Sequence, residues 1–201
     1  MPGCIHDCTA KLTRAEGDGS RVPCVRELCD QIEYTLRMAA NTWIPDSLYK
    51  QIQQSVPRVC VDLLPICKRT FRLGLILRET PAQRDAWCLV GGRVWIGESL
   101  GDAVSRHLIG TLGDRVRFTA PPIQHAMIAE YLPTSLPPAL HDPRQHSIAL
   151  NWICFIDGEI QACGEAKSFE WYQPAEIPWD NIGFGQGKVI EALLKGIPDV
   201  R

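Results

Sequence analysis

The sequence predicts an α+β fold, in the form of an α/β/α sandwich whose mixed sheet carries helices on both faces. Three observations predict it. Short runs rich in β-branched and other apolar residues recur along the chain, a few helical patterns interrupt them, and no internal repeat is visible. The length of 201 residues fits one compact domain with an extension, because single domains usually contain about 100–200 residues.

The N-terminal part of the chain differs from the rest in composition. Residues 1–21 are polar and include the run AEGDGS, which cannot bury a core. Over residues 22–40, apolar side chains recur every three or four positions, and Pro23 suits a first helical turn, so an amphipathic helix is expected. We therefore expect residues 1–40 to form an N-terminal helical extension and residues 41–201 to form the folded domain.

Three helices are expected in the folded domain. The first covers residues 45–55, where apolar side chains share one face. The second begins after Ser99, a favourable N-cap with Asp102 at the third helical position, and Gly113 ends it. The third covers residues 188–196, near the end of the chain.

The strands of the sheet are predicted from short runs of β-branched, aromatic and other apolar residues. These runs cover residues 59–66, 71–78, 86–90, 115–118, 124–132, 146–156 and 167–172. The dipeptide Asp157-Gly158 favours a tight hairpin turn, so residues 159–163 are expected to return as a further strand.

Charge and composition exclude several classes of function. The net charge is −2, with both signs mixed along the chain, which gives no electrostatic reason to bind nucleic acid. No apolar run approaches the roughly 20 residues that cross a bilayer, and the first residues do not resemble a signal peptide. The nine irregularly spaced cysteines fit reduced thiols. We expect a cytoplasmic protein without a nucleic-acid or membrane partner; a homodimer is left open.

The stretch WCLVGGRVWIGESLGDAVSRHLIGTLGD, residues 87–114, carries a chemical motif. Five residues separate Gly92 from Glu98, and seven separate Glu98 from Arg106. This spacing resembles the Nudix box, G-x5-E-x7-R-E-U-x-E-E-x-G-U, where U is an aliphatic residue. The three glutamates that should follow Arg106 are replaced by His107, Gly110 and Thr111. The chain is therefore identified as a divergent member of the Nudix hydrolase superfamily with a degenerate box.

The likeness extends beyond the box. Residues 43–186 resemble a small, poorly characterised Nudix-related family, and the run GGRV is shared with the GDP-mannose mannosyl hydrolase branch. The resemblance implies a Nudix fold and a phosphorylated small molecule as substrate. In a complete box, glutamates on one helical face hold Mg²⁺, which neutralises the diphosphate and activates water. Because threonine, glycine and neutral histidine cannot supply that charge, we expect one Mg²⁺ or Mn²⁺ ion at most.

Two residues of the box each have two interpretations. In Nudix proteins the glutamate that matches Glu98 pairs with the box arginine, here Arg106, and braces the loop; the alternative is direct metal ligation. His107 lies next to Arg106 on another helical face, where it is either a structural histidine or a catalytic group.

A loop far downstream supplies a further catalytic candidate. In the similar mannosyl hydrolases, a metal ligand and a histidine base precede an aromatic strand that resembles KSFEWY here. Aligned on Trp171, Glu165 stands at the ligand position and Ala166 at the position of the base. We predict Glu165 as metal ligand or general base, the alternative being a solvated loop glutamate.

Four residues are predicted to contact the substrate. Arg93 follows the glycine pair, where its guanidinium can fork onto phosphate oxygens, and the matching arginine aids the departing diphosphate in the similar sugar hydrolases. Trp95 is placed to stack a base or sugar. Arg144 and His146 are expected at the mouth of the pocket, although the turn HDPRQH that carries them is also an ordinary strand entrance.

These residues predict a divergent Nudix-type hydrolase that acts on a nucleoside diphosphate-linked metabolite, in particular a nucleotide sugar of a biosynthetic pathway. Two alternatives stay open. One is a catalytically inactive Nudix-fold protein that binds a nucleotide, and the other is a hydrolase of a non-nucleotide phosphorylated metabolite. The combination of Arg93, Glu98 and Glu165 favours the enzyme, since a purely structural protein has little need of it.

Overall fold

The computed structural model describes residues 45–119, 126–135 and 139–195. The helix predicted over residues 22–40 and the rest of the N-terminal extension lie outside this part of the chain. Within the described ranges, no helix is long and apolar enough to cross a membrane.

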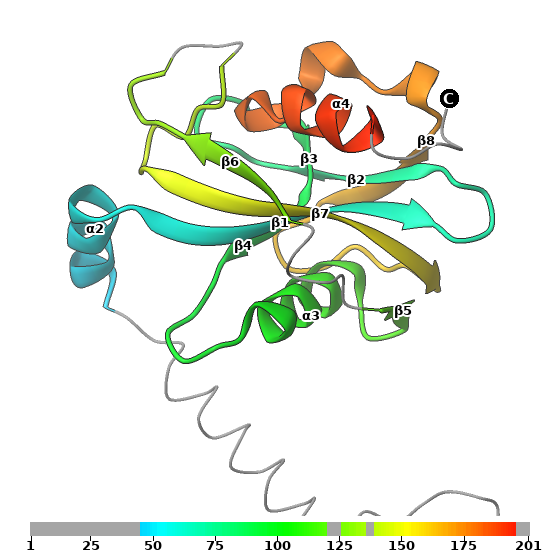
Figure 1. Ribbon diagram of the computed structural model, residues 1–201, viewed down its shortest axis with the longest axis horizontal. Coiled ribbons are helices and arrows are strands. Elements are labelled where there is room, and N and C mark those ends of the chain that lie inside the picture. The colour runs from blue at the N-terminus through cyan, green and yellow to red at the C-terminus, as the bar shows by residue number, and fades with distance from the viewer. Residues whose placement is uncertain (1–44, 120–125, 136–138, 196–201) are drawn as a thin grey trace, which may run out of the picture. The chain divides into compact units, whose positions relative to one another are not determined.

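Eight strands of the described residues form one mixed sheet, as the sequence predicts (Figure 1). At its centre, β1 (Arg58–Cys67) runs parallel to β7 (Ser147–Gly158), and every other pairing is antiparallel. The order is β3-β2-β1-β7-β5, with β4 on β1, β6 on β7 and β8 on β2. The remaining strands are β2 (Leu73–Arg78), β3 (Ala86–Cys88), β4 (Val90–Arg93), β5 (Val116–Phe118), β6 (Met127–Tyr131) and β8 (Ser168–Tyr172).

Helices cover both faces of the sheet. Figure 1 shows α3 (Leu100–Leu112) on one face and α4 (Gly187–Lys195) on the other, with α2 (Asp46–Ser55) beside the start of β1. Short 3-10 turns lead into α4; they are Pro174–Glu176, Trp179–Asn181 and Gly183–Gly185. This arrangement confirms the α+β fold and its α/β/α layers.

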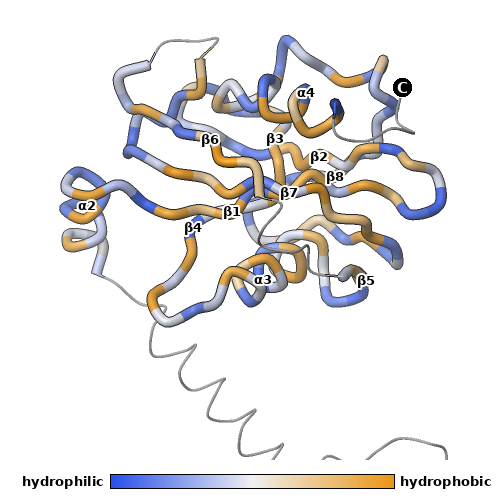
Figure 2. Tube along the Cα trace, viewed as in Figure 1, coloured by the Kyte–Doolittle hydropathy of each residue, from blue (hydrophilic) through white to orange (hydrophobic). Residues whose placement is uncertain are grey.

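Apolar side chains on both faces of the central strands hold the layers together. Val61 of β1 packs in the cluster that contains Leu108 of α3, whereas Leu64 packs in the cluster that contains Ile190 of α4. Figure 2 shows the same distribution, with apolar residues along β1 and β7. Because both faces are buried, β1 is a nearly continuous apolar run, and the polar Asp62 within it stands out.

The helix of the motif forms where the sequence predicts it. The Ser99 side chain caps α3 by accepting a hydrogen bond from the Asp102 backbone N–H at 3.1 Å. Gly113 ends the helix with φ 90°, a conformation that glycine adopts without strain.

Two predictions about strands need correction. The run at residues 86–90 is broken into β3 and β4 at Leu89, whose N–H donates to Gln186 Oε1 at 2.9 Å. The strand predicted over residues 159–163 is wrong. β7 continues through Asp157-Gly158, and β5 pairs with residues 156–158 where the predicted hairpin would turn. Instead, the N–H groups of Gln161 and Cys163 donate to the last carbonyls of α3.

Candidate functional site

A cavity of about 620 Å³ opens among α2, α3, the central strands and the loops that precede β7, β8 and α4. This volume lies within the usual range of small-molecule sites, roughly 300–1,000 Å³. Its lining is rich in ionisable groups, and arginines outnumber carboxylates. The ionisable residues with acidic or basic side chains that line it are Arg58, Asp62, Arg78, Arg93, Arg106, His107, Asp142, Arg144 and Glu165.

Alternation along β1 places three side chains in this cavity. Arg58, Cys60 and Asp62 line it because every second residue of a strand faces the same side. In the antiparallel neighbour β4, Arg93 pairs with Cys60 and Gly91 pairs with Asp62. A Cβ on Gly91 would stand 2.1 Å from the Val61 carbonyl oxygen and 2.5 Å from Asp62 Oδ1, so only glycine fits beside this part of β1.

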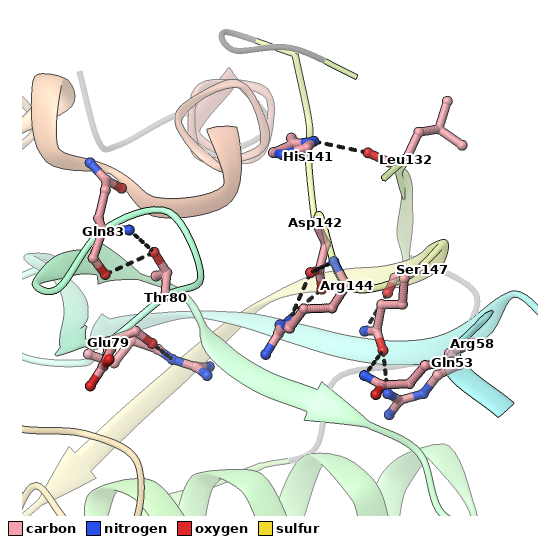
Figure 3. Close-up of polar contacts among 12 residues, drawn as sticks. Gln53, Arg58, Glu79, Thr80, Gln83, Leu132, His141, Asp142, Arg144 and Ser147 are labelled. Atoms are coloured by element: carbon pink, nitrogen blue, oxygen red, sulfur yellow. Dashed lines mark hydrogen bonds and ion pairs between the residues drawn. The ribbon is translucent and has the colours of Figure 1, made fainter. Parts of the chain in front are cut away.

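Tyr49 of α2 holds two arginines of this strand pair. The guanidinium of Arg58 lies 4.8 Å from the centre of the Tyr49 ring, and that of Arg93 lies 4.7 Å from it. Arg58 also donates to the Tyr49 hydroxyl and to Gln145 Oε1, which accepts a further bond from Gln53 at 2.9 Å. Figure 3 shows Arg58 and Gln53 side by side near the start of β1. Arg93 was predicted from the sequence to contact the substrate. Arg58, which was not predicted, lies against the same tyrosine ring.

Glu165 lies in the cavity, as predicted, and forms an ion pair with Arg78 of β2. Its Oε1 stands 2.8 Å from Arg78 Nη1. Partial burial raises the pKa of Glu165, while the positive charges of Arg78 and Arg144 act in the opposite direction. The preceding Gly164 passes so close to Gly110 of α3 that a Cβ would stand 2.7 Å from its carbonyl oxygen. This close passage directs the loop that carries Glu165 toward the cavity.

Arg144 also lines the cavity, and Asp142 holds it there. Its Nε and Nη2 each donate to one oxygen of the Asp142 carboxylate at 2.9 Å (Figure 3). The ring of Phe184 lies 5.4 Å from the Arg144 guanidinium and 5.9 Å from that of Arg78. Phe184 adopts φ 57°, which costs a non-glycine residue energy and is common at binding sites. No signal in the sequence indicated Phe184.

The pair of Glu98 and Arg106 is present as predicted. Arg106 Nε lies 2.6 Å from Glu98 Oε1, and Nη2 lies 2.7 Å from Oε2. Arg106 Nη2 also donates to the Arg93 carbonyl, and the Trp95 backbone N–H donates to Glu98. The Glu98 side chain is fully buried and does not line the cavity. The geometry of Glu98 therefore favours a structural pair with Arg106 over direct ligation of a metal ion.

The Trp95 side chain supports the same brace. The Arg106 guanidinium stacks over its ring at 3.6 Å. Trp95 does line the cavity, but this stacking occupies one face of the ring. Only the other face is available for the base or sugar that the sequence predicts it to stack.

His107 lines the cavity as a largely buried imidazole. Its Nε2 lies 3.1 Å from the Arg93 carbonyl oxygen, which only accepts, and 3.3 Å from Arg106 Nη1, which only donates. Burial, with a contribution from the positive charge of Arg106, lowers the pKa of His107 to about 4. A neutral imidazole that contacts the end of β4 favours the structural interpretation of His107.

The face of α3 that carries the acids in a complete box is empty here. A Cβ built on Gly110 would meet nothing within 4 Å, so the cavity borders open space at this position. Thr111 is buried, and its carbonyl accepts a hydrogen bond from Cys163 N at 3.0 Å. The substitution at Gly110 therefore leaves room where a carboxylate would stand.

Asp62 is a buried carboxylate in the cavity and is not among the site residues predicted from the sequence. Its Oδ2 accepts hydrogen bonds from the Tyr131 hydroxyl at 3.3 Å and from Gln186 Nε2 at 3.5 Å. Burial raises the pKa of Asp62 to about 6, against the opposing effect of the Tyr131 hydrogen bond. The signal that could have indicated it is the acid within the apolar run VCVDLLPI.

His146 is the predicted contact residue that the fold places elsewhere. It does not line the cavity, and its Nε2 lies 2.8 Å from Glu130 Oε1 of β6. Its neighbours Gln145 and Ser147 line the cavity, whereas the His146 side chain, just before the start of β7, reaches β6. The expected place of His146 at the pocket mouth needs this correction.

A Nudix box implies a metal ion held by carboxylates. The carboxylates of this cavity are already engaged: Asp142 with Arg144, Glu165 with Arg78, and Asp62 with Tyr131 and Gln186. Across residues 45–119, 126–135 and 139–195, no three histidines, cysteines or acids are grouped to hold a metal ion. The donor set that the structure describes therefore does not fit the acidic metal cluster of a complete box.

A family model described as "Domain of unknown function (DUF4916)" matches residues 39–194. The chain belongs to this family. No curated protein matches this DUF4916 chain significantly. Among solved structures, it resembles a possible asymmetric diadenosine tetraphosphate (Ap4A) hydrolase from Jonesia denitrificans, with 28% identity and a TM-score of 0.64. That match covers 70% of this chain and 94% of the other.

Two further solved structures show which fold the DUF4916 chain has. The NUDIX domain of Shewanella oneidensis NrtR, complexed with ADP ribose, is 15% identical with a TM-score of 0.53, covering 77% of this chain and 94% of that chain. A bifunctional NMN adenylyltransferase/ADP ribose pyrophosphatase from Francisella tularensis, complexed with AMP and a Mn ion, is 21% identical with a TM-score of 0.55. That match covers 86% of this chain and about half, 48%, of the other. The DUF4916 chain has a Nudix-like fold.

Proposed function

We propose that the protein is a Nudix-type hydrolase that acts on a nucleoside diphosphate-linked metabolite, in particular a nucleotide sugar. The observation that carries the proposal is the arginine-rich cavity beside the end of β4, which Arg106, paired with Glu98, holds through the Arg93 carbonyl. A strand end that is fixed and presents arginine to a cavity suits the recognition of phosphate oxygens. The resemblance to a possible Ap4A hydrolase and to an ADP-ribose complex supports a substrate with linked phosphates.

Two side chains carry the proposed chemistry. Arg93 contacts the diphosphate and stabilises the charge that develops on the leaving group. Glu165 accepts a proton from the attacking water, and burial, which raises its pKa, makes it a stronger base than a solvated glutamate. Arg78, 2.8 Å away, orients the Glu165 carboxylate. A divalent ion enters no step of this scheme, because the described donors do not fit an acidic metal cluster.

A second candidate function is binding without hydrolysis. It is favoured by the replacement of the three box glutamates with His107, Gly110 and Thr111. Without acids on this face of α3, the cavity still has the arginines needed to hold a phosphorylated ligand but lacks a metal-activated nucleophile.

The test is a screen of nucleotide sugars, dinucleoside polyphosphates, nucleotides and non-nucleotide phosphorylated metabolites. Each compound is incubated with the full-length protein in Mg²⁺, Mn²⁺ or EDTA, and both bound ligand and released product are measured. Turnover of a nucleoside diphosphate-linked compound that Glu165→Gln abolishes supports the hydrolase. Tight binding of such a compound without product in all three buffers overturns it and supports the binding protein.

A further inference from the structure

The arginines of the cavity divide into two groups. Arg78, Arg106 and Arg144 are each paired with a carboxylate, namely Glu165, Glu98 and Asp142. Arg58 and Arg93 have no ion pair with any residue that the structure describes. Unpaired guanidinium groups in a cavity leave positive charge for a ligand to neutralise.

The positions of Arg58 and Arg93 follow from the sheet. Arg58 is two residues before Cys60 on β1, and Arg93 of β4 stands opposite Cys60 in the antiparallel register. The two arginines therefore lie on the same side of adjacent strands. Both line the cavity.

The ring of Tyr49 fixes both guanidinium groups. Each lies within 5 Å of the ring centre, at 4.8 Å for Arg58 and 4.7 Å for Arg93. Contact with the face of an aromatic ring attracts the cation without using its N–H donors. Arg58 is held further by the Tyr49 hydroxyl and Gln145, both neutral. The ring thus reduces the entropy lost when the arginines bind an anion. Among residues 45–119, 126–135 and 139–195, no acceptor takes a hydrogen bond from the Arg93 side chain.

We propose that Arg58 and Arg93, held by Tyr49, form a phosphate subsite that binds the diphosphate of the ligand without a divalent cation. The proposal rests on the proposed function for the class of ligand, and it names how the site holds the phosphates. The two guanidinium groups supply the positive charge that Mg²⁺ supplies in a complete Nudix box. It also assigns α2 a role in binding, through Tyr49.

The direct test is isothermal titration with two probes, ADP and inorganic pyrophosphate, against the full-length protein in EDTA and in Mg²⁺. We expect ADP to bind in EDTA with a Kd within about threefold of the value in Mg²⁺, since the protein itself neutralises the phosphates. Binding of both probes indicates that the subsite recognises the diphosphate itself, and binding of ADP alone indicates that it needs the attached nucleoside. Binding that requires Mg²⁺, or no binding of either probe, overturns the proposal.

Variants locate the subsite. Arg93→Gln and Arg58→Gln are each expected to weaken ADP binding by about tenfold, and the double variant by about 100-fold, since a charged hydrogen bond contributes roughly 1.5–3 kcal/mol. Arg117→Gln is the matched control: this exposed arginine of β5 pairs with Asp157 outside the cavity, and its loss should change Kd less than twofold. Unchanged binding in the double variant overturns the proposal.

Two safeguards keep the result interpretable. Arg93→Lys retains the positive charge but loses the bidentate guanidinium, so ADP binding should be weaker than in wild type and tighter than in Arg93→Gln. This variant tests the subsite even if Arg93→Gln folds poorly. Tyr49→Phe keeps the ring and removes only the hydroxyl that Arg58 contacts, so it should weaken binding less than Tyr49→Ala. Binding that depends on these arginines but gives no turnover supports the subsite and contradicts the hydrolase. Turnover together with binding that requires Mg²⁺ supports the hydrolase and contradicts the subsite.

Discussion

Arg106 binds both carboxylate oxygens of Glu98, with Nε 2.6 Å from Oε1 and Nη2 2.7 Å from Oε2. The same guanidinium stacks on Trp95 and donates to the Arg93 carbonyl. One ion pair therefore connects the segment before α3, the middle of α3 and the end of β4. These contacts need none of the metal-binding acids of a complete box.

We expect Glu98→Gln to destabilise the fold strongly. It leaves the buried Arg106 guanidinium without its charge partner, and breaking a buried pair usually costs about 3–5 kcal/mol. In a domain of this size the midpoint of thermal unfolding should fall by on the order of 10 °C. The control is Glu159→Gln, which breaks an exposed pair with Arg115 and should change the midpoint little. Equal melting of the two variants would contradict the brace.

Glu165→Gln should lower turnover of the best substrate by about 10²–10⁴-fold, the usual contribution of a general base. The carboxylate is partly exposed at 37%, but its loss leaves the Arg78 guanidinium, 18% exposed, without its ion-pair partner, so the midpoint of thermal unfolding should also fall. Thr111→Ala should reduce turnover far less, because a hydroxyl is a poor base at neutral pH. Steady-state kinetics of the three proteins decide the matter, and full turnover in the Glu165 variant would reject the proposed base.

Asp62→Asn should change how stability depends on pH. The folded-state pKa of Asp62, about 6, is above its ordinary value of 3.8, so the fold favours the protonated carboxyl. Its stabilising effect is present below pH 4 and is lost as pH rises through 6, at a cost on the order of 3 kcal/mol. Urea denaturation between pH 4 and 7 should show the variant gaining stability relative to wild type as pH rises. A constant difference would contradict the assignment.

His107 should have the opposite effect on stability. Its folded-state pKa of about 4 is below its ordinary value of 6.5, so the fold favours the neutral imidazole. The stabilising effect is present above pH 6.5 and is lost as pH falls toward 4. His107→Gln should therefore lose less stability than wild type between pH 6.5 and 4.5 in the same urea experiment. A histidine resonance that titrates near pH 6.5 and disappears in this variant would show His107 to be solvated instead.

The metal prediction can be tested by restoring the acids. For the wild-type protein we expect weak binding of one Mg²⁺ ion at most, and two or more tight sites in a calorimetric titration would refute this. Gly110→Glu with Thr111→Glu should increase Mg²⁺ affinity, because a side chain at position 110 has open space and would face the cavity. A folded double variant whose Mg²⁺ binding is unchanged would mean that these positions do not face a common site.

The sequence by itself determined the layers of the fold and the frame of the motif. Local patterns specify both: the capped helix after Ser99 and the fixed spacing of Gly92, Glu98 and Arg106 depend on residues close in the chain. The spacing also predicted the pair of Glu98 and Arg106, and the position of Glu165 in the cavity followed from the resemblance of its loop.

Only the tertiary structure decided which side chains meet in the cavity. Tyr49 and Arg93 are 44 positions apart in the sequence (93 minus 49), and a stacking contact between them has no local pattern. His146, directly before β7, contacts Glu130 of β6 and does not line the cavity, and this contact joins residues 16 positions apart (146 minus 130). The strand predicted over residues 159–163 failed because β7 continues through Asp157-Gly158, and β5 pairs with residues 156–158 where the predicted hairpin would turn. The periodicity of apolar residues predicts which helix or strand a residue belongs to. A binding site depends instead on contacts between elements that are distant in the sequence.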